Sequence, residues 1–487
     1  MLNKKRYFIF IFIIISIFIF INNSCRKETF TTNPADKLIF TKDTIRFDTI
    51  FTNIGSATRK FVVKNPSKSK SINVDRIYLA KHENSKYKLN IDGMPTDNLR
   101  DKVIPPGDSI HIFVIVKIDP NRDQMIEQDS IVFLSNGNQQ DVKLIAYGQD
   151  VILLNGNTIE TNTTWNANKP VLIYNRVIVN PDVVLNVDAG AKVYFHKNSS
   201  LFVFGTLKVN GAINNRVLFA GDRLEEYYSD IAGQWGAYEK NEAGETTAIY
   251  GGIHLFETSR NNEINYADIK NSTIGVQVAS NEIPDNPNLI LKGTNIENSQ
   301  IAALYALGAN VQAENCVFAN SGQYNLGCVM GGKYSFIHCT MANYWRGNRQ
   351  TPQLFFNNSF ADNSGNYVTR GLSANFGNSI IYGSRDSEID IQDLSGTSVA
   401  LEFENCLIKF KDTAYLKSSG NFVDNIFNKD PKFKSTGKKP YDYQLDSLSS
   451  AKDIGSYYIG TLVPYDQLGN SRLNDGKPDL GAFEREE

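Results

Sequence analysis

The chain has 487 residues, of which 41% are hydrophobic and 11% aromatic, so it is long and apolar enough to bury large cores. Its 50 Lys and Arg against 52 Asp and Glu give a formal net charge of −2, which removes the basic bulk charge expected of a nucleic-acid-binding domain. Five Cys and five His match no common zinc spacing or disulfide framework. We therefore expect no metal, no cofactor and no nucleic acid partner.

The N-terminus has the pattern of a secretory signal. Lys4, Lys5 and Arg6 precede a run of fifteen residues, 7–21, that is apolar except for Ser16. This is a charged region followed by a hydrophobic one. Because the run is shorter than the roughly 20 residues needed to cross a bilayer, we predict a cleaved signal rather than a permanent transmembrane helix.

A cysteine stands directly after the hydrophobic run. The sequence Asn22-Asn-Ser-Cys25 resembles the lipobox of bacterial lipoproteins, in the looser form of the Bacteroidota, with a small residue at Ser24 but Asn22 where Leu is usual. The resemblance implies that residues 1–24 are a signal peptide and that Cys25 is acylated. Cys25 would then hold the protein at the outer membrane of the cell envelope, on either face, with residues 25–36 as a tether. An ordinary secretory signal with an incidental Cys is the alternative.

Residues 37–150 read as a small β-sandwich. In the run 109–119, Ile110, Ile112, Val114 and Val116 share one face, as alternation along a strand requires. Similar runs separated by turn residues occur at 37–41, 44–51, 60–65, 72–80, 87–91, 130–134 and 142–147. The strand at 61–65 and the Pro-Pro-Gly-Asp turn at 105–108 resemble the immunoglobulin-like domains of bacterial surface proteins. The resemblance implies a spacer or docking role.

After residue 150 a short apolar strand ending in Asn recurs along the chain. The apolar anchors of the repeat are separated by 27, 22, 23, 40 and 27 residues, and we interpret the 40 as two turns of 20; they are Ile269, Ile296, Phe318, Met341, Ile381 and Ile408. A period near 22 predicts a solenoid. The strands are too short and too β-branched for paired helices. Asn271, Asn298, Asn320 and Asn343 follow the strands, and Asn tolerates left-handed backbone angles and can stack in an amide ladder.

These features predict an all-β protein, a right-handed parallel β-helix preceded by the small β-sandwich. About eleven coils of 22 residues fit between residues 170 and 410. Three coil motifs, Gly205-Thr-Leu, Gln234-Trp-Gly and Asn315-Cys-x-Phe, resemble the parallel β-helix repeat family of Bacteroidota lipoproteins, within the pectate-lyase-like superfold. The resemblance assigns residues 151–420 to the β-helix.

The C-terminal residues 421–487 carry a second resemblance. Pro464-x-Asp466-x-x-Gly469-x-x-Arg472 and the later Asp-Leu-Gly-Ala-Phe-Glu484 are similar to the choice-of-anchor segments of such proteins. We expect this segment to seal one end of the solenoid and the sandwich to cover the other, since stacked coils need covered ends.

The repeat also places cysteines and one histidine. Cys316 and Cys339 are one coil apart and Cys406 lies 67 residues further, read as three coils, so we expect an inward column of free thiols. Cys328 has no clear partner. His338 should point outward or cap a turn, and we assign it no catalytic role.

Catalysis is not indicated by the sequence. Polysaccharide lyases of this superfold use acidic calcium clusters with a Lys or Arg base, and polygalacturonases use paired Asp with Gly-His-Gly; the sequence shows neither, so we name no catalytic residue. Two insertions, 221–250 and 343–350, carry side chains suited to sugars and their acidic groups. We name Tyr344, Trp345, Arg346, Arg349, Trp235 and Arg223 as candidate glycan-binding residues.

Three functions stay open. The first is a non-catalytic module that binds acidic polysaccharide or takes part in envelope assembly, the second is a lyase or hydrolase of acidic glycans, and the third is a structural or adhesive surface rod. For Trp235 and Trp345, the alternative to glycan binding is that their rings pack over the open edges of coils.

Overall fold

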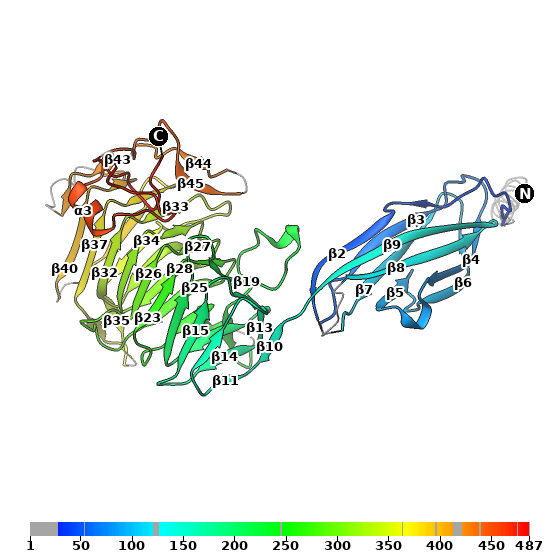
Figure 1. Ribbon diagram of the computed structural model, residues 1–487, viewed down its shortest axis with the longest axis horizontal. Helices are drawn as coiled ribbons and strands as arrows, with labels where there is room; N and C mark the ends of the chain where they lie inside the picture. Colours follow the sequence, from blue (N-terminus) through cyan, green and yellow to red (C-terminus); the bar gives the residue numbers. More distant parts are fainter. Residues whose placement is uncertain are drawn as a thin grey trace, which may run out of the picture. The chain divides into compact units, whose positions relative to one another are not determined.

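The computed structural model describes residues 28–486, except 53, 120–125, 244–245, 363, 395–396, 413–420, 438–439 and 475. The chain divides into two compact units, Met1–Asp150 and Val151–Glu487 (Figure 1). The expected signal peptide and Cys25 lie outside the described residues. Within the described ranges, no helix is long and apolar enough to span a membrane.

The first unit is a β-sandwich with one apolar core. Its sheets have the orders β1-β3-β7-β5 and β2-β9-β8-β4-β6. The elements are β1 (Ile39–Phe40), β2 (Thr44–Phe51), β3 (Arg59–Lys64), β4 (Ile72–Leu79), η1 (His82–Asn84), β5 (Tyr87–Ile91), β6 (Asn98–Ile104), β7 (Ser109–Val116), β8 (Ile126–Ser135) and β9 (Asn138–Gln149). Ile112 and Val114 of β7 are fully buried whereas Ile115 is 42% exposed, so the alternation identified the core face.

Turn chemistry accounts for the β8–β9 hairpin, and the lack of apolar alternation explains why strand β6 was not predicted. Asn136 and Gly137 have φ values of 49° and 73°, the left-handed pair that a two-residue hairpin turn requires. Strand β6 pairs with β4 at the sheet edge. Its sequence NLRDKVI has no apolar alternation because only Ile104 of its residues is buried, so pattern analysis missed it.

The second unit is a parallel β-helix, as predicted, with three sheets along its length (Figure 1). Sheet 1 contains β10 (Ile152–Asn155), β13 (Val171–Tyr174), β16 (Lys192–Phe195), β19 (Val217–Gly221), β24 (Ala267–Lys270), β27 (Asn295–Glu297), β30 (Val317–Ala319), β33 (Thr340–Asn343), β38 (Ile380–Gly383), β41 (Leu407–Ile408) and β43 (Ile426–Phe427). Sheet 2 contains β11 (Thr158–Ile159), β14 (Arg176–Val179), β17 (Ser200–Val203), β22 (Ile253–Leu255), β25 (Ile274–Ala279), β28 (Ala302–Leu307), β31 (Tyr324–Val329), β34 (Leu354–Asn357) and β39 (Ile389–Gln392). Sheet 3 contains β12 (Thr163–Trp165), β15 (Val184–Asp188), β18 (Thr206–Asn210), β23 (Asn262–Asn265), β26 (Leu289–Lys292), β29 (Asn310–Glu314), β32 (Gly332–Ile337), β37 (Leu372–Gly377), β40 (Val399–Glu404) and β42 (Phe422–Val423).

The six repeat anchors stack in one column of sheet 1. Successive anchors are register partners from Ile269 to Ile408, and each is fully buried. Met341 pairs directly with Ile381, so the interpretation of their 40-residue separation as two coils is wrong. One long coil holds the loop 344–353 and the hairpin of β35 (Ser359–Ala361) and β36 (Tyr367–Thr369). The β-strands of sheet 1 also begin earlier, at Ile152, than the predicted residue 170.

The corners between sheets 1 and 2 use left-handed asparagines. Asn271, Asn298 and Asn320 have φ values of 64°, 56° and 53°, which Asn tolerates better than most residues. Asn298 donates from Nδ2 to Oδ1 of Asn271 at 2.7 Å, one rung of the expected ladder. Asn343 does not continue it; its amide donates to the Ser321 carbonyl.

The described cysteines are free and buried, as predicted. Cys406 lies two coils beyond Cys339, not three, because the residues between Met341 and Ile381 form one long coil rather than two. Burial raises the pKa of the Cys406 thiol to about 12, so these thiols are poor nucleophiles.

The C-terminal segment, residues 430–486, lies along the flank of the β-helix. It contains β44 (Phe433–Ser435), β45 (Asp442–Leu445) and α3 (Tyr457–Leu462). Tyr443 and Ala482 pack on Val317, Ala319 and Ala342 of sheet 1. We expected residues 421–487 to seal one end of the solenoid. Strands β42 and β43 of this range continue sheets 3 and 1, and the later residues contact the outer face of sheet 1 and Gly377 at the end of β37.

Candidate functional site

The candidate site is a groove on the outer face of sheet 1. Asp268 and Lys270 of β24 and Asn295 and Glu297 of β27 point outward because they flank the buried anchors Ile269 and Ile296. From β30 onward the outward positions are apolar except Thr340, which accepts a hydrogen bond from the Ala482 N–H, and the C-terminal segment covers them. The groove therefore occupies the coils where the cover ends.

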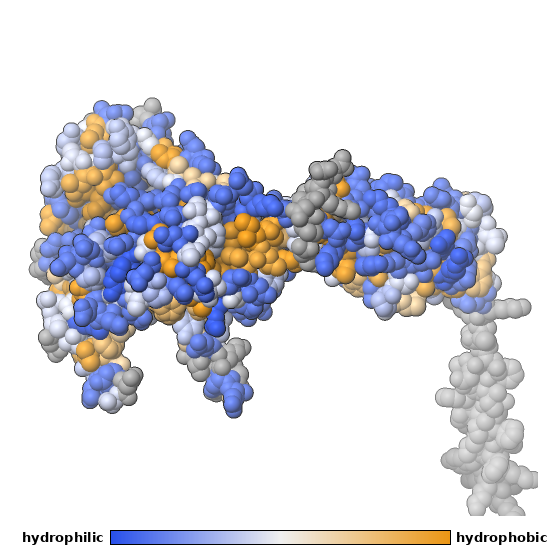
Figure 2. All heavy atoms as spheres, turned by 60° about the horizontal axis from the view of Figure 1, so that its bottom comes forward, coloured by the Kyte–Doolittle hydropathy of each residue, from blue (hydrophilic) through white to orange (hydrophobic). Residues whose placement is uncertain are grey.

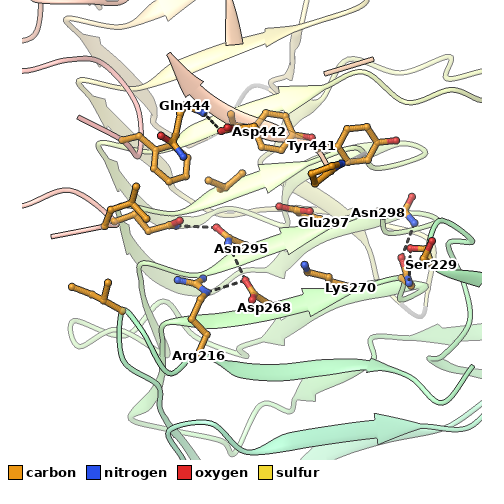
Figure 3. A pocket seen from close by; sticks show the side chains of 18 residues that line it. Arg216, Ser229, Asp268, Lys270, Asn295, Glu297, Asn298, Tyr441, Asp442 and Gln444 are labelled. Carbon is orange, nitrogen blue, oxygen red and sulfur yellow. Dashed lines mark hydrogen bonds and ion pairs between the residues drawn. The ribbon is translucent and has the colours of Figure 1, made fainter. Parts of the chain in front are cut away.

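Three parts of the chain line the groove, which has a volume of about 540 Å³. The floor is the outer face of β24 and β27, one side is the C-terminal segment, and Ser229 comes from the 222–236 loop (Figure 3). The C-terminal residues that line it are Pro440, Tyr441, Asp442, Tyr443, Gln444, Gln467, Leu468 and Phe483.

One half of the floor is held by a hydrogen-bonded ion pair. Arg216 donates from Nε to Oδ1 of Asp268 at 3.0 Å, and Asn295 donates to the same oxygen at 2.9 Å (Figure 3). Gln467 of the C-terminal segment donates to Asn295 Oδ1 at 2.9 Å. Asp268 is thus fixed, and its second oxygen, Oδ2, accepts no hydrogen bond from the described residues.

The other half of the floor holds two charged groups that the protein leaves available. Lys270 and Glu297 are register partners on neighbouring coils, and the side chain of neither makes a hydrogen bond with any described residue. Burial raises the pKa of the Glu297 carboxyl, Lys270 opposes the shift, and the negative charge of Asp268 adds to it. A ligand in the groove would meet an ammonium donor and a carboxyl group side by side.

A second hollow of about 150 Å³ continues the groove and contains three of the predicted residues. Tyr344, Trp345 and Arg346 line it with Asp230, Asn298, Asn320, Gly347 and Tyr441. Asn298 and Tyr441 also line the larger groove, so the two hollows adjoin. Arg346 lies 5.9 Å from the Tyr441 ring centre and donates to the Gly437 carbonyl at 2.6 Å. Trp345 is partly exposed, and glycan binding by these three residues stays a prediction.

The other three predicted residues do not line the groove. Trp235 is fully buried, stacks on Phe195 at 4.1 Å and donates to the Lys270 carbonyl at 2.7 Å. The glycan-binding prediction is wrong for Trp235, because a ring packed over a coil edge has no face for a sugar; the alternative packing role is correct. Arg223 pairs with Glu225 within its own loop.

Arg349 is also unavailable to a ligand. It is 6% exposed, and its guanidinium donates to both carboxylate oxygens of Glu388 at 2.8 and 2.7 Å. Glu388 also accepts from the backbone N–H groups of Gln353 and Arg385. Arg349 therefore positions the loop that carries Trp345, and the prediction that it contacts a glycan is wrong.

His338 points outward from its coil but is fully buried under the C-terminal segment. Its Nε2 lies 3.1 Å from Nδ2 of Asn378. Burial, and then the nearby Arg472, lower the pKa of His338 well below its usual value. A neutral, enclosed imidazole next to structural residues fits no reaction in the groove.

The sequence analysis missed the groove floor. Asp268, Lys270, Asn295 and Glu297 stand one position to either side of the anchors, and the equivalent positions on later coils are Val317, Ala319, Thr340 and Ala342. Polar outward neighbours on two adjacent coils were the available signal. Asp268 and Glu297 put one carboxylate on each of two successive coils. Across the described ranges, no group of three or more His, Cys, Asp or Glu is placed to bind a metal ion.

Comparisons with known proteins assign the chain to no family. No family model matches the chain, and no curated protein matches it. Solved structures with partial similarity include a family 123 glycoside hydrolase from Clostridium perfringens, studied for glycolipid glycan hydrolysis, at 10% identity and TM-score 0.17 over 24% of this chain and 26% of that one. The periplasmic chaperone SfaE matches at 11% identity and TM-score 0.17 over 24% of this chain and 60% of its own.

A third structure, the PapD-like domain 7 of human CEP192, matches at 8% identity and TM-score 0.17 over 27% of this chain and 96% of its own. The chain spans about a quarter of the length of the first of these proteins. Similarity at this level supports no statement about activity or partners.

Proposed function

We propose that the protein is a cell-envelope lipoprotein, anchored through Cys25, whose β-helix binds an acidic glycan in the groove on sheet 1. The observation that carries the proposal is the groove itself. Its two hollows form one path from the Lys270 and Glu297 pair to the partly exposed ring of Trp345 and the guanidinium of Arg346. These four side chains are placed toward open space.

The chemistry of this lining suits a sugar chain with acidic units. Aromatic faces pack on the apolar faces of sugar rings, and Arg presents a planar fork that matches a carboxylate or sulfate. Lys270 and Glu297 offer a donor and an acceptor for hydroxyl groups. Asp268 is neutralised by Arg216, so the floor does not present a block of negative charge to an acidic polymer.

Calorimetric titration of the full chain with polygalacturonate tests the proposal. The double variant Trp345→Ala and Arg346→Ala should weaken binding by about tenfold or more, because it removes a stacking face and a charged fork. The matched control is Tyr458→Ala with Lys333→Ala, which removes an exposed ring from α3 and an exposed cation from β32 of sheet 3. An affinity unchanged by the groove variant would refute the proposal.

One observation favours a second function, cleavage of the glycan. A lyase needs a basic group and carboxylates in one groove, and Lys270, Asp268 and Glu297 lie together on the floor. In β-elimination, Lys270 as the neutral amine would take the proton from the carbon next to the carboxylate of a uronic unit. A carbon–carbon double bond would form as the bond to the leaving oxygen breaks, and the protonated carboxyl of Glu297, whose pKa burial raises, would give that oxygen its proton. Unsaturated ends that accumulate with the wild type but not with Lys270→Met would establish it; binding without product excludes it.

A further inference from the structure

The outer face of sheet 2 carries aromatic rings that the groove on sheet 1 does not use. Along this face, Gln277, Tyr305, Gly327, Phe355 and Asp390 follow one another in register on five neighbouring coils. Their inward neighbours are core residues, so these five positions point away from the core. Together with Tyr324, the rings Tyr305 and Phe355 are named here the sheet 2 platform.

The glycine in this row lets a tyrosine ring lie against the sheet. A Cβ atom at Gly327 would stand 2.5 Å from Cδ2 and 2.8 Å from Cε2 of Tyr305. The Tyr305 ring therefore lies directly over the Gly327 backbone, where any larger residue would displace it. Tyr324 stacks on Phe355 with ring centres 5.2 Å apart and an interplanar angle of 24°. All three rings are partly exposed.

Two hairpins stand at opposite ends of the strands that form this face. The hairpin of β20 (Ala237–Lys240) and β21 (Thr246–Tyr250) precedes β22, and the Tyr238 hydroxyl lies 3.1 Å from that of Thr273, at the start of β25. The β35–β36 hairpin follows β34, and Arg370 after it donates to the Ser280 carbonyl at the end of β25. Figure 2 shows two arms projecting from the β-helix with a recess between them.

The charges on this face select one kind of ligand. Asp390 is the charged group that acts on Tyr324, where it adds to the effect of burial in raising the pKa of the phenol. Its carboxylate makes no hydrogen bond with any described residue, and none of the five in-register positions is a cation. A phosphate or uronic acid chain would be repelled, whereas a carboxylate accepts hydrogen bonds from sugar hydroxyls.

We propose that the sheet 2 platform binds an uncharged polysaccharide, stacked on Tyr305, Tyr324 and Phe355 with hydroxyl groups directed to Asp390. A platform for single-stranded nucleic acid would combine aromatic rings with a positively charged track, whereas the five in-register positions of this face include no Lys or Arg. The site shares no residue with the groove on sheet 1, and its ligand differs in charge. The two proposals can therefore be tested independently.

Native electrophoresis of the full chain in gels containing hydroxyethyl cellulose, laminarin or galactomannan tests the proposal. Wild-type protein should be retarded in at least one of the three gels. Tyr324→Ala should raise the dissociation constant about tenfold, since it removes a stacking face. Gly327→Ala should weaken binding while every ring is kept, because the added Cβ lifts Tyr305 from the sheet.

Tyr458→Ala serves as the control, because this ring is 71% exposed on α3 and lies outside the platform. The variant carrying Trp345→Ala and Arg346→Ala should keep its retardation in neutral gels, which separates this test from that of the groove. The proposal is overturned if no neutral gel retards the wild type. It is equally overturned if Tyr324→Ala and Gly327→Ala, with unchanged circular dichroism, migrate as the wild type does.

Discussion

The buried ion pair between Arg349 and Glu388 gives a sharp test of how the loop carrying Trp345 is held. The side chains are 2% and 0% exposed, and two hydrogen bonds of 2.8 and 2.7 Å join them. Replacing Arg349 with Met would leave the Glu388 carboxylate in the interior. Only the backbone N–H groups of Gln353 and Arg385 would then remain as donors to it.

We expect Arg349→Met to lower the free energy of unfolding by about 3–5 kcal/mol, because loss of one partner leaves a buried charge uncompensated. Adding Glu388→Gln removes that charge, so the double variant should lose only about 1–2 kcal/mol relative to the wild type. The loss in the double variant should therefore be much smaller than the sum of the losses in the two single variants. If the ion pair contributed little to stability, the two losses would simply add.

Arg223→Met is the matched control, since it breaks an Arg–Glu pair whose Arg223 side chain is 40% exposed. Its loss should be below about 1 kcal/mol. Urea denaturation followed by circular dichroism measures the wild type, the single variants Arg349→Met, Glu388→Gln and Arg223→Met, and the double variant, so that the coupling can be calculated. Equal losses for Arg349→Met and Arg223→Met would refute the argument that burial makes the first pair decisive.

Two further predictions concern pH and the C-terminal segment. His254 is 4% exposed, and burial lowers its pKa to about 4. As the pH falls below about 6.5, the unfolded state binds a proton at this residue before the folded state does. The stability that the neutral imidazole contributes is therefore complete above about pH 6.5 and is lost as the pH falls toward 4. Between about pH 7.5 and about pH 5, the wild type should lose about 2 kcal/mol more than His254→Phe in urea denaturation, and equal losses would contradict this. Arg472 is fully buried and donates to Glu484 at 3.2 Å. Arg472→Met should speed proteolysis of residues 430–486 on the order of a hundredfold, because it leaves a buried carboxylate without its partner. An unchanged rate of proteolysis would show that the pair does not hold the segment.

The repeat made the β-helix predictable, because its inward positions obey one rule on every coil. Ile296, Phe318 and Met341 had to be apolar and regularly spaced to fill the interior, and the period followed from them. The same rule misled where a coil was long. An insertion adds residues without changing the stack, so the distance from Met341 to Ile381 resembled two coils while the structure has one.

The site was less predictable because outward positions obey no repeat. Trp345 and Arg346 were recognised as ligand-type residues in an insertion, but the same reasoning chose Trp235 and Arg349, which packing and ion pairing bury. Residue type cannot tell a ring that covers a coil edge from one that faces solvent. That distinction depends on contacts, such as Phe195 against Trp235, between residues of neighbouring coils that stand 40 positions apart in the sequence.

The position of the groove follows from the C-terminal segment. Val317 and Ala319 on β30 are apolar because this segment covers them, and the outward residues of β27, one coil earlier, are polar because the cover does not close over them. The segment is also one wall of the groove, through Tyr441 and Gln467. The buried Arg472 and Glu484 pair lies directly behind this wall, because Arg472 donates to Asn315 and Gln467 donates to the Asn315 carbonyl. The geometry of the binding groove therefore depends on buried contacts that no ligand would touch.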